Sequence, residues 1–82
     1  MATLNDAITL LEGGDWEAAH PIVQEDSSRL GCWAHGIVHM LEGDLDNAGY
    51  WYRRAERERP TPDQVTAELA ALKHAVEAAD SE

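Results

Sequence analysis

The residues best able to bind metals or transfer protons lie in one short stretch near the middle of the chain. Cys32, His35, His39 and Glu42 follow one another at spacings of three, four and three residues. Because residues three or four apart share one face of an α-helix, these side chains would form a single stripe of ligands, acids or bases. The opposite face would be apolar, so the stripe is the first candidate for a functional site.

The spacing of the histidines is one that binds metal ions in other proteins. Histidines four residues apart, such as His35 and His39, can share a metal, as they do in zinc peptidases. The residue after His35 is Gly36, so the catalytic glutamate of that motif is missing. His20 lies in an earlier predicted helix and could supply a third imidazole. Three imidazoles and one open position would suit zinc or another divalent metal, although the sequence requires no cofactor.

Two further interpretations of the same face need no metal. The first is a small-ligand or acid–base site, in which near-neutral imidazoles transfer protons. Its candidate groups are His35, His39 and Glu42 for catalysis, with His20, Asn47, Tyr50 and Arg54 for ligand binding. In the second interpretation the histidines are packing residues between helices, and Cys32 is a small buried apolar residue. Because an unpaired buried polar group costs about 1–3 kcal/mol, such histidines would need hydrogen-bond partners. We assign no enzymatic activity.

Helix start and stop signals predict five helices that would position these groups. The helices pair into one hairpin over residues 3–26 and a second over residues 28–59, followed by a capping helix over residues 62–79. The second hairpin bends at Gly43, and its last helix should run to about Arg59, ahead of a proline. No segment alternates with the period of a strand. The sequence therefore predicts one all-α domain over residues 1–82.

The second hairpin resembles the tetratricopeptide repeat, in which Trp-x2-Leu-Gly-x2-Tyr precedes Ala-x3-Phe and a final Pro. The positions that fit the pattern are Gly36, Gly43, Ala48, Tyr52, Ala55 and Pro60. The first hairpin fits weakly. The resemblance implies a right-handed array of antiparallel hairpins, closed by the C-terminal helix. Cys32, His35 and His39 depart from it, because they stand where the repeat usually has Trp, Leu and Tyr.

The chain also resembles a group of short microbial proteins. They share the string His-x3-His-x2-Glu-Gly-Asp-x2-Asn-Ala, followed by Tyr-Trp-Tyr-Arg-Arg, which here spans residues 35–54. No activity is known for that group, so this resemblance implies no mechanism.

Charge and composition limit the classes of partner. The net charge of −10 repels phosphate backbones, so we expect no nucleic-acid partner. The N-terminal stretch has no basic start, and no apolar run approaches the ~20 residues of a membrane span. With Cys32 as its one cysteine, the chain forms no intramolecular disulfide. We therefore expect a cytoplasmic protein without a membrane partner.

Two functions agree with these observations. Helical arrays usually bind proteins, so the repeat resemblance implies a protein- or peptide-interaction module, by analogy of fold. Two hairpins are fewer than the three or more repeats that such arrays need, so we expect either a homodimer or tight docking of the fifth helix. The alternative is the small-ligand or metal site on the His35, His39 and Glu42 face, with His20 contributing.

Overall fold

The computed structural model describes residues 2–80, and within this part of the chain it is all-α, as the sequence predicts. Residues 1, 81 and 82 of the predicted 1–82 domain lie outside the described part. The helices within residues 2–80 include no candidate membrane span. The elements are α1 (Leu4–Glu12), α2 (Trp16–Gln24), α3 (Arg29–Glu42), α4 (Leu45–Arg54) and α5 (Val65–Asp80), with a 3-10 turn at Pro62–Gln64.

Side-chain caps begin the first four helices where the sequence indicates. At α1, Thr3 and Asp6 form a reciprocal capping box: the Thr3 N–H donates to Asp6 at 2.8 Å, and the Asp6 N–H donates to Thr3 at 3.4 Å. Asp15, Ser28 and Asp44 each accept a backbone N–H in the first turn of α2, α3 and α4. Such caps satisfy amide groups that have no partner inside the helix. They fix the start of each helix, and so the angular position of the side chains that follow.

The C-terminus of α4 differs from the prediction. We expected the helix to reach about Arg59, but it ends at Arg54. Glu56 has a φ of 61°, and the Arg57 N–H donates to the Tyr52 carbonyl at 2.9 Å. This is a Schellman-type ending, which usually has glycine at the position of positive φ. The expectation was wrong because residue 56 is glutamate, which carries no such signal.

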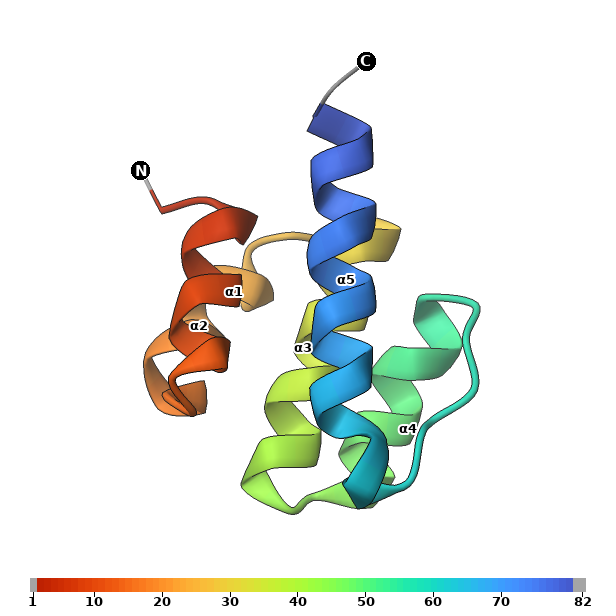
Figure 1. Cartoon of the computed structure of the whole chain (residues 1–82). Helices are drawn as coiled ribbons and strands as arrows, with labels where there is room; N and C mark the ends of the chain where they lie inside the picture. The colour runs from red at the N-terminus through yellow and green to blue at the C-terminus, as the bar shows by residue number, and fades with distance from the viewer. Residues whose placement is uncertain (1, 81–82) are drawn as a thin grey trace.

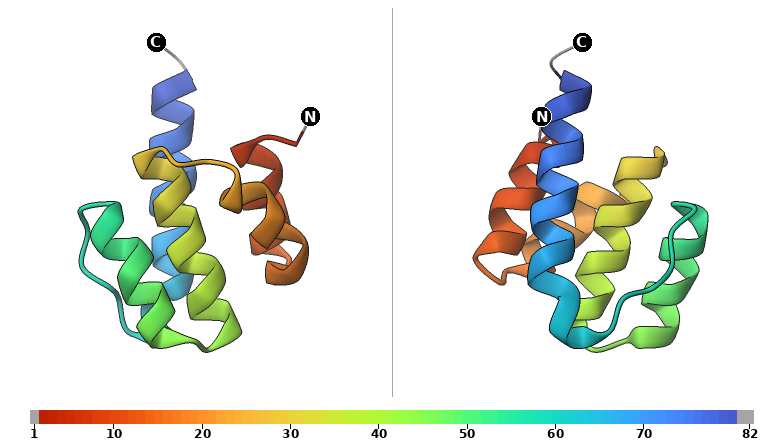
Figure 2. Two further views of the ribbon diagram at one scale, coloured as in Figure 1. Left: turned by 180° about the vertical axis from the view of Figure 1, so that it is seen from behind. Right: turned by 45° about the vertical axis from the view of Figure 1, so that its right-hand side comes forward.

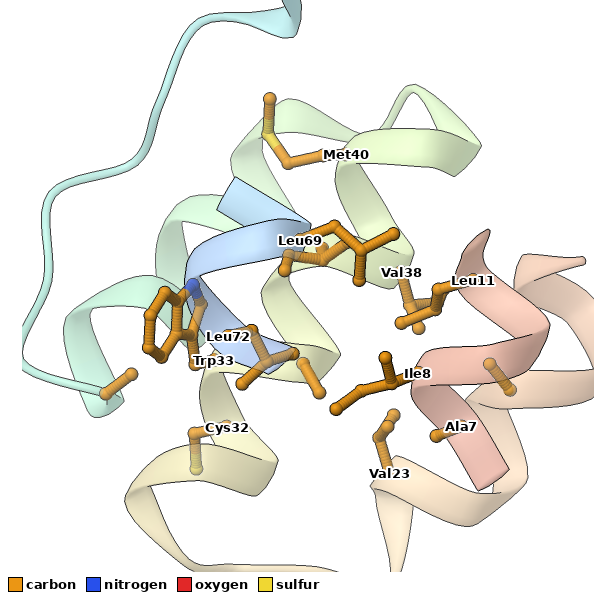
Figure 3. Packing of buried hydrophobic residues seen from close by; sticks show 14 of the residues in the cluster. Ala7, Ile8, Leu11, Val23, Cys32, Trp33, Val38, Met40, Leu69 and Leu72 are labelled. Atoms are coloured by element: carbon orange, nitrogen blue, oxygen red, sulfur yellow. The ribbon is translucent and has the colours of Figure 1, made fainter. Parts of the chain in front are cut away.

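Helix α3 lies at the centre of the molecule and packs against each of the other four helices. Figure 1 shows α1 and α2 on one side of it and α4 on the other, with α5 in front; in the view from behind in Figure 2, α5 lies at the back. The apolar core lies where α1, α3 and α5 meet (Figure 3), and Ile8, Leu11, Val38 and Leu72 are all buried there. The core therefore occupies one face of α3, and the histidines are left on another.

A half-buried carboxylate, that of Glu68, fixes α5 against the second hairpin. Glu68 Oε1 accepts hydrogen bonds from Trp33 Nε1 at 3.1 Å and from the Tyr52 hydroxyl at 2.9 Å. Burial first, and then the Glu68 carboxylate, raise the pKa of Tyr52 well above its usual range. The hydroxyl therefore stays a donor. Arg57 lies over the Trp33 ring at 3.6 Å from its centroid, which covers the cluster and explains why the chain leaves α4 early.

The closest approach of α3 to α4 occurs at a glycine. A Cβ atom built on Gly36 would lie 2.5 Å from Cδ2 of the Tyr52 ring. The Tyr52 side chain is fully buried and held by Glu68, so it has no free space into which to move. Only glycine allows the two helices to approach this closely. The contact also sets the distance between the next residues of each helix, His35 and Trp51.

We predict that Gly36→Ala lowers the free energy of unfolding by about 1–3 kcal/mol, because overpacking outweighs the better helix propensity of alanine. Gly49→Ala in α4 is the matched control, since its Cβ would meet its nearest atom at an ordinary 3.5 Å. That variant should gain up to about 1 kcal/mol. Urea unfolding followed by circular dichroism measures both. Equal stability of the two variants would contradict the proposed close contact.

Candidate functional site

Three histidines from two helices converge on one point. His20 comes from α2, and His35 and His39 come from α3. One ring nitrogen from each lies within 4.8 Å of the others, in a grouping that could hold a metal ion. The His20 ring meets the other two edge-on, with centroids 5.0 and 5.3 Å away, whereas His35 and His39 stack at 4.9 Å. The structure therefore brings His20 beside the pair.

The histidines open onto a pocket of about 590 Å³. This volume lies in the range of small-molecule sites in proteins. Each of the three helices that surround it contributes residues from one face. The lining residues are Trp16, Glu17, His20 and Gln24 from α2, His35, His39 and Glu42 from α3, and Asp44, Asn47 and Trp51 from the start and body of α4.

His35 is the most buried of the three, with 3% of its surface exposed. The Trp51 ring stacks on it at 3.8 Å between centroids, with 9° between the ring planes. Burial lowers the pKa of His35 to about 4, with smaller contributions from His39, His20 and Arg54. The ring is therefore neutral at physiological pH. A neutral imidazole offers a nitrogen lone pair to a metal ion or to a ligand proton.

His39 is 6% exposed and has a partner of its own. Its Nδ1 lies 2.8 Å from Oε1 of Glu42, one turn further along α3. Because a carboxylate accepts hydrogen bonds, Nδ1 donates to Glu42, and a neutral His39 ring then presents the lone pair of Nε2. Carboxylates orient metal-binding histidines in this way. His39, Glu42 and Asp44 form a second group within 4.8 Å, but both acids are exposed and Asp44 also caps α4.

The remaining predicted site residues fall into two groups. Asn47 lines the pocket. Tyr50 and Arg54 do not: Tyr50 is 45% exposed, and Arg54 donates to its hydroxyl at 3.2 Å. Arg54 lies 5.1 Å from the centroid of the Trp51 ring. Cys32 is buried with a weak contact to a backbone oxygen, which agrees with its interpretation as an apolar residue.

Several lining residues were missed by the sequence analysis. They are Trp16, Glu17, Gln24, Asp44 and Trp51. A signal for them was present, because residues 16, 20 and 24 recur every four positions, and residues 44, 47 and 51 are spaced by three and four. Both spacings mark single helix faces. Only the packing of three helices, however, directs those faces toward one point.

Comparisons with protein-family models, with curated proteins and with solved structures find no match to this chain. The tetratricopeptide resemblance and the resemblance to short microbial proteins therefore rest on the sequence pattern alone and stay predictions.

We predict that the metal-free protein loses stability as the pH falls from about 6.5 toward 4. The pKa of His35 is lowered to about 4 in the folded state, so the unfolded chain binds this proton first. Stability is fully present above the unfolded pKa and declines below it, by up to about 3 kcal/mol.

Urea unfolding at a series of pH values tests this, with His35→Gln as the comparison because glutamine is neutral throughout. As the pH falls through this range, the wild type should lose more unfolding free energy than the variant. Parallel pH profiles for the two proteins would show that His35 is not protected from protonation.

Proposed function

We propose that the protein binds a divalent transition-metal ion through His20, His35 and His39, and leaves one coordination position open to the pocket. The single observation that carries this proposal is the convergence of one nitrogen from each ring within 4.8 Å. Three histidines with an open position are typical of catalytic rather than purely structural zinc sites.

The state of the rings suits a metal ion of the zinc type. Burial keeps His35 neutral, and Glu42 orients His39 so that its Nε2 lone pair is available. Neutral imidazoles favour zinc, copper, nickel and cobalt over magnesium or calcium. A tetrahedral ion with bonds of about 2.0–2.1 Å needs nitrogens roughly 3.3 Å apart, so the rings must move slightly inward. His20 is only partly buried and lines the open pocket, so its ring is the least constrained of the three.

The residues around such a site would support it in different ways. Trp51 stacks on His35 and fixes the plane of its ring. The fourth position would face the pocket, where it can hold water or a small ligand. A bound ion would supply Lewis acidity there. The interaction module and homodimer implied by the repeat resemblance remain predictions, because the comparisons with known proteins find no match that tests them.

We predict that the wild type, purified without a histidine tag, binds one Zn²⁺ or Co²⁺ per chain, and that His20→Ala weakens binding at least ~10-fold. Loss of a direct ligand should exceed the 10–100-fold effect of disturbing its supporting partner. His20→Ala is the preferred variant, since His20 is less buried than the other two histidines. Metal content and isothermal titration calorimetry give stoichiometry and affinity.

His74→Ala is the matched control, because His74 is exposed on α5, away from the pocket. It should bind metal as the wild type does. The wild type should also gain about 2.7 kcal/mol of unfolding free energy at a metal concentration 100 times the Kd. The proposal fails if the wild type takes up no metal, or if the His20→Ala and His74→Ala variants bind it equally.

A further inference from the structure

We infer that the open side of the three-histidine site takes a small nitrogen ligand that carries a positive charge, of the amine or azole class, in preference to an oxyanion. This inference rests on the proposed metal site, and it names the class of molecule that the pocket would hold beside the ion.

The charged groups that line the pocket, apart from its histidines, are all acidic. Glu17, Glu42 and Asp44 contribute carboxylates, and no lysine or arginine is among the lining residues of the described chain. Arg54 is the one cation that affects His35 electrostatically. Its guanidinium is bonded to Tyr50 outside the pocket. An oxyanion would therefore meet three negative charges and no positive side chain.

A count of formal charges gives the direction of the preference. A divalent ion with three neutral imidazoles carries +2, and the three lining carboxylates carry −3, so the loaded pocket is at −1. An anionic ligand makes this imbalance larger. A neutral nitrogen donor with a cationic group elsewhere in the molecule cancels it. Complementary charge of this kind determines which ligands a site accepts.

The pocket also has aromatic surfaces for a cation. Trp16 and Trp51 both contribute to its lining. The Trp51 ring is already stacked on His35 and has Arg54 over it at 5.1 Å, so the ligand cation would meet Trp16. Cations are attracted to the faces of aromatic rings, most strongly to tryptophan. Asn47 and Gln24 add amide groups that accept and donate hydrogen bonds. These groups favour an organic cation over a simple hydrated ion.

The type of metal ion determines which donor atom the ligand should offer. A borderline divalent ion held by three imidazoles binds a fourth neutral nitrogen well. The ligand then needs a nitrogen at one end for the ion and a positive group at the other end for the carboxylates. The pocket volume of about 590 Å³ accommodates both ends.

The test uses the Co²⁺-loaded protein, because the visible absorption of cobalt changes when its fourth ligand is replaced. Three probes share the same imidazole donor and differ only in the charge of the tail. They are 1-(3-aminopropyl)imidazole, 1-butylimidazole and 3-(imidazol-1-yl)propionate. We expect the cationic probe to bind most tightly and the anionic probe most weakly, with at least ~10-fold between their Kd values.

Two variants locate the origin of the preference. Glu17→Gln and Asp44→Asn each remove one lining charge, and asparagine still caps a helix. At roughly 7 Å in water, one charge pair changes the affinity by about threefold, so each variant should weaken binding of the cationic probe by about that factor. Glu77→Gln on α5 changes the net charge equally, away from the pocket, and is the matched control.

The outcomes distinguish failure of this inference from failure of the proposed function. Tighter or equal binding of the anionic probe to the cobalt protein overturns the inference and leaves the metal site intact. Equal weakening of the cationic probe by Glu77→Gln assigns the preference to the net charge of −10, and also overturns it. Absence of a cobalt spectrum overturns both proposals. A cation preference that only the Glu17 and Asp44 variants reduce supports the inference.

Discussion

The close contact between α3 and α4 is the constraint on which the rest of the structure depends. Gly36 lets the ring of Tyr52 approach within a distance that no side chain would allow. The neighbouring residues of each helix are His35 and Trp51, and the same approach stacks their rings at 3.8 Å. The contact therefore shapes one wall of the pocket. Glu68 holds the tyrosine from the other side and so ties α5 to the same point.

The pocket requires the protein to bury polar rings that would be more stable in water. His35 is kept neutral by burial, which lowers its pKa to about 4 and makes folding sensitive to acid. The cost of burying His39 is offset by its hydrogen bond to the Glu42 carboxylate. No hydrogen bond within residues 2–80 reaches the rings of His20 or His35. Perturbed groups in a cleft are typical of functional sites, where stability is exchanged for reactivity. A metal ion would bind both rings from the pocket that they line.

The sequence predicted much of the fold because its signals are local. Thr3 with Asp6, and Ser28 before α3, are caps that need no tertiary contact, and they begin two of the helices. The end of α4 was missed, because Arg57 leaves the helix to cover Trp33, a residue far away in sequence. In the site, spacing alone identified the histidines. The contributions of Trp16 and Trp51, and the position of Arg54 outside the pocket, depend on how three helices pack, which spacing along one helix cannot give.

The central claim is that three imidazoles share one metal ion. X-ray absorption at the zinc edge of the loaded protein tests it most directly. The account predicts three imidazole nitrogens and one further light atom at about 2.0–2.1 Å, in a four-coordinate environment. A six-coordinate shell of oxygens would place the ion on the acidic surface. A sulfur at about 2.3 Å would assign it to Cys32, and either result would contradict the account.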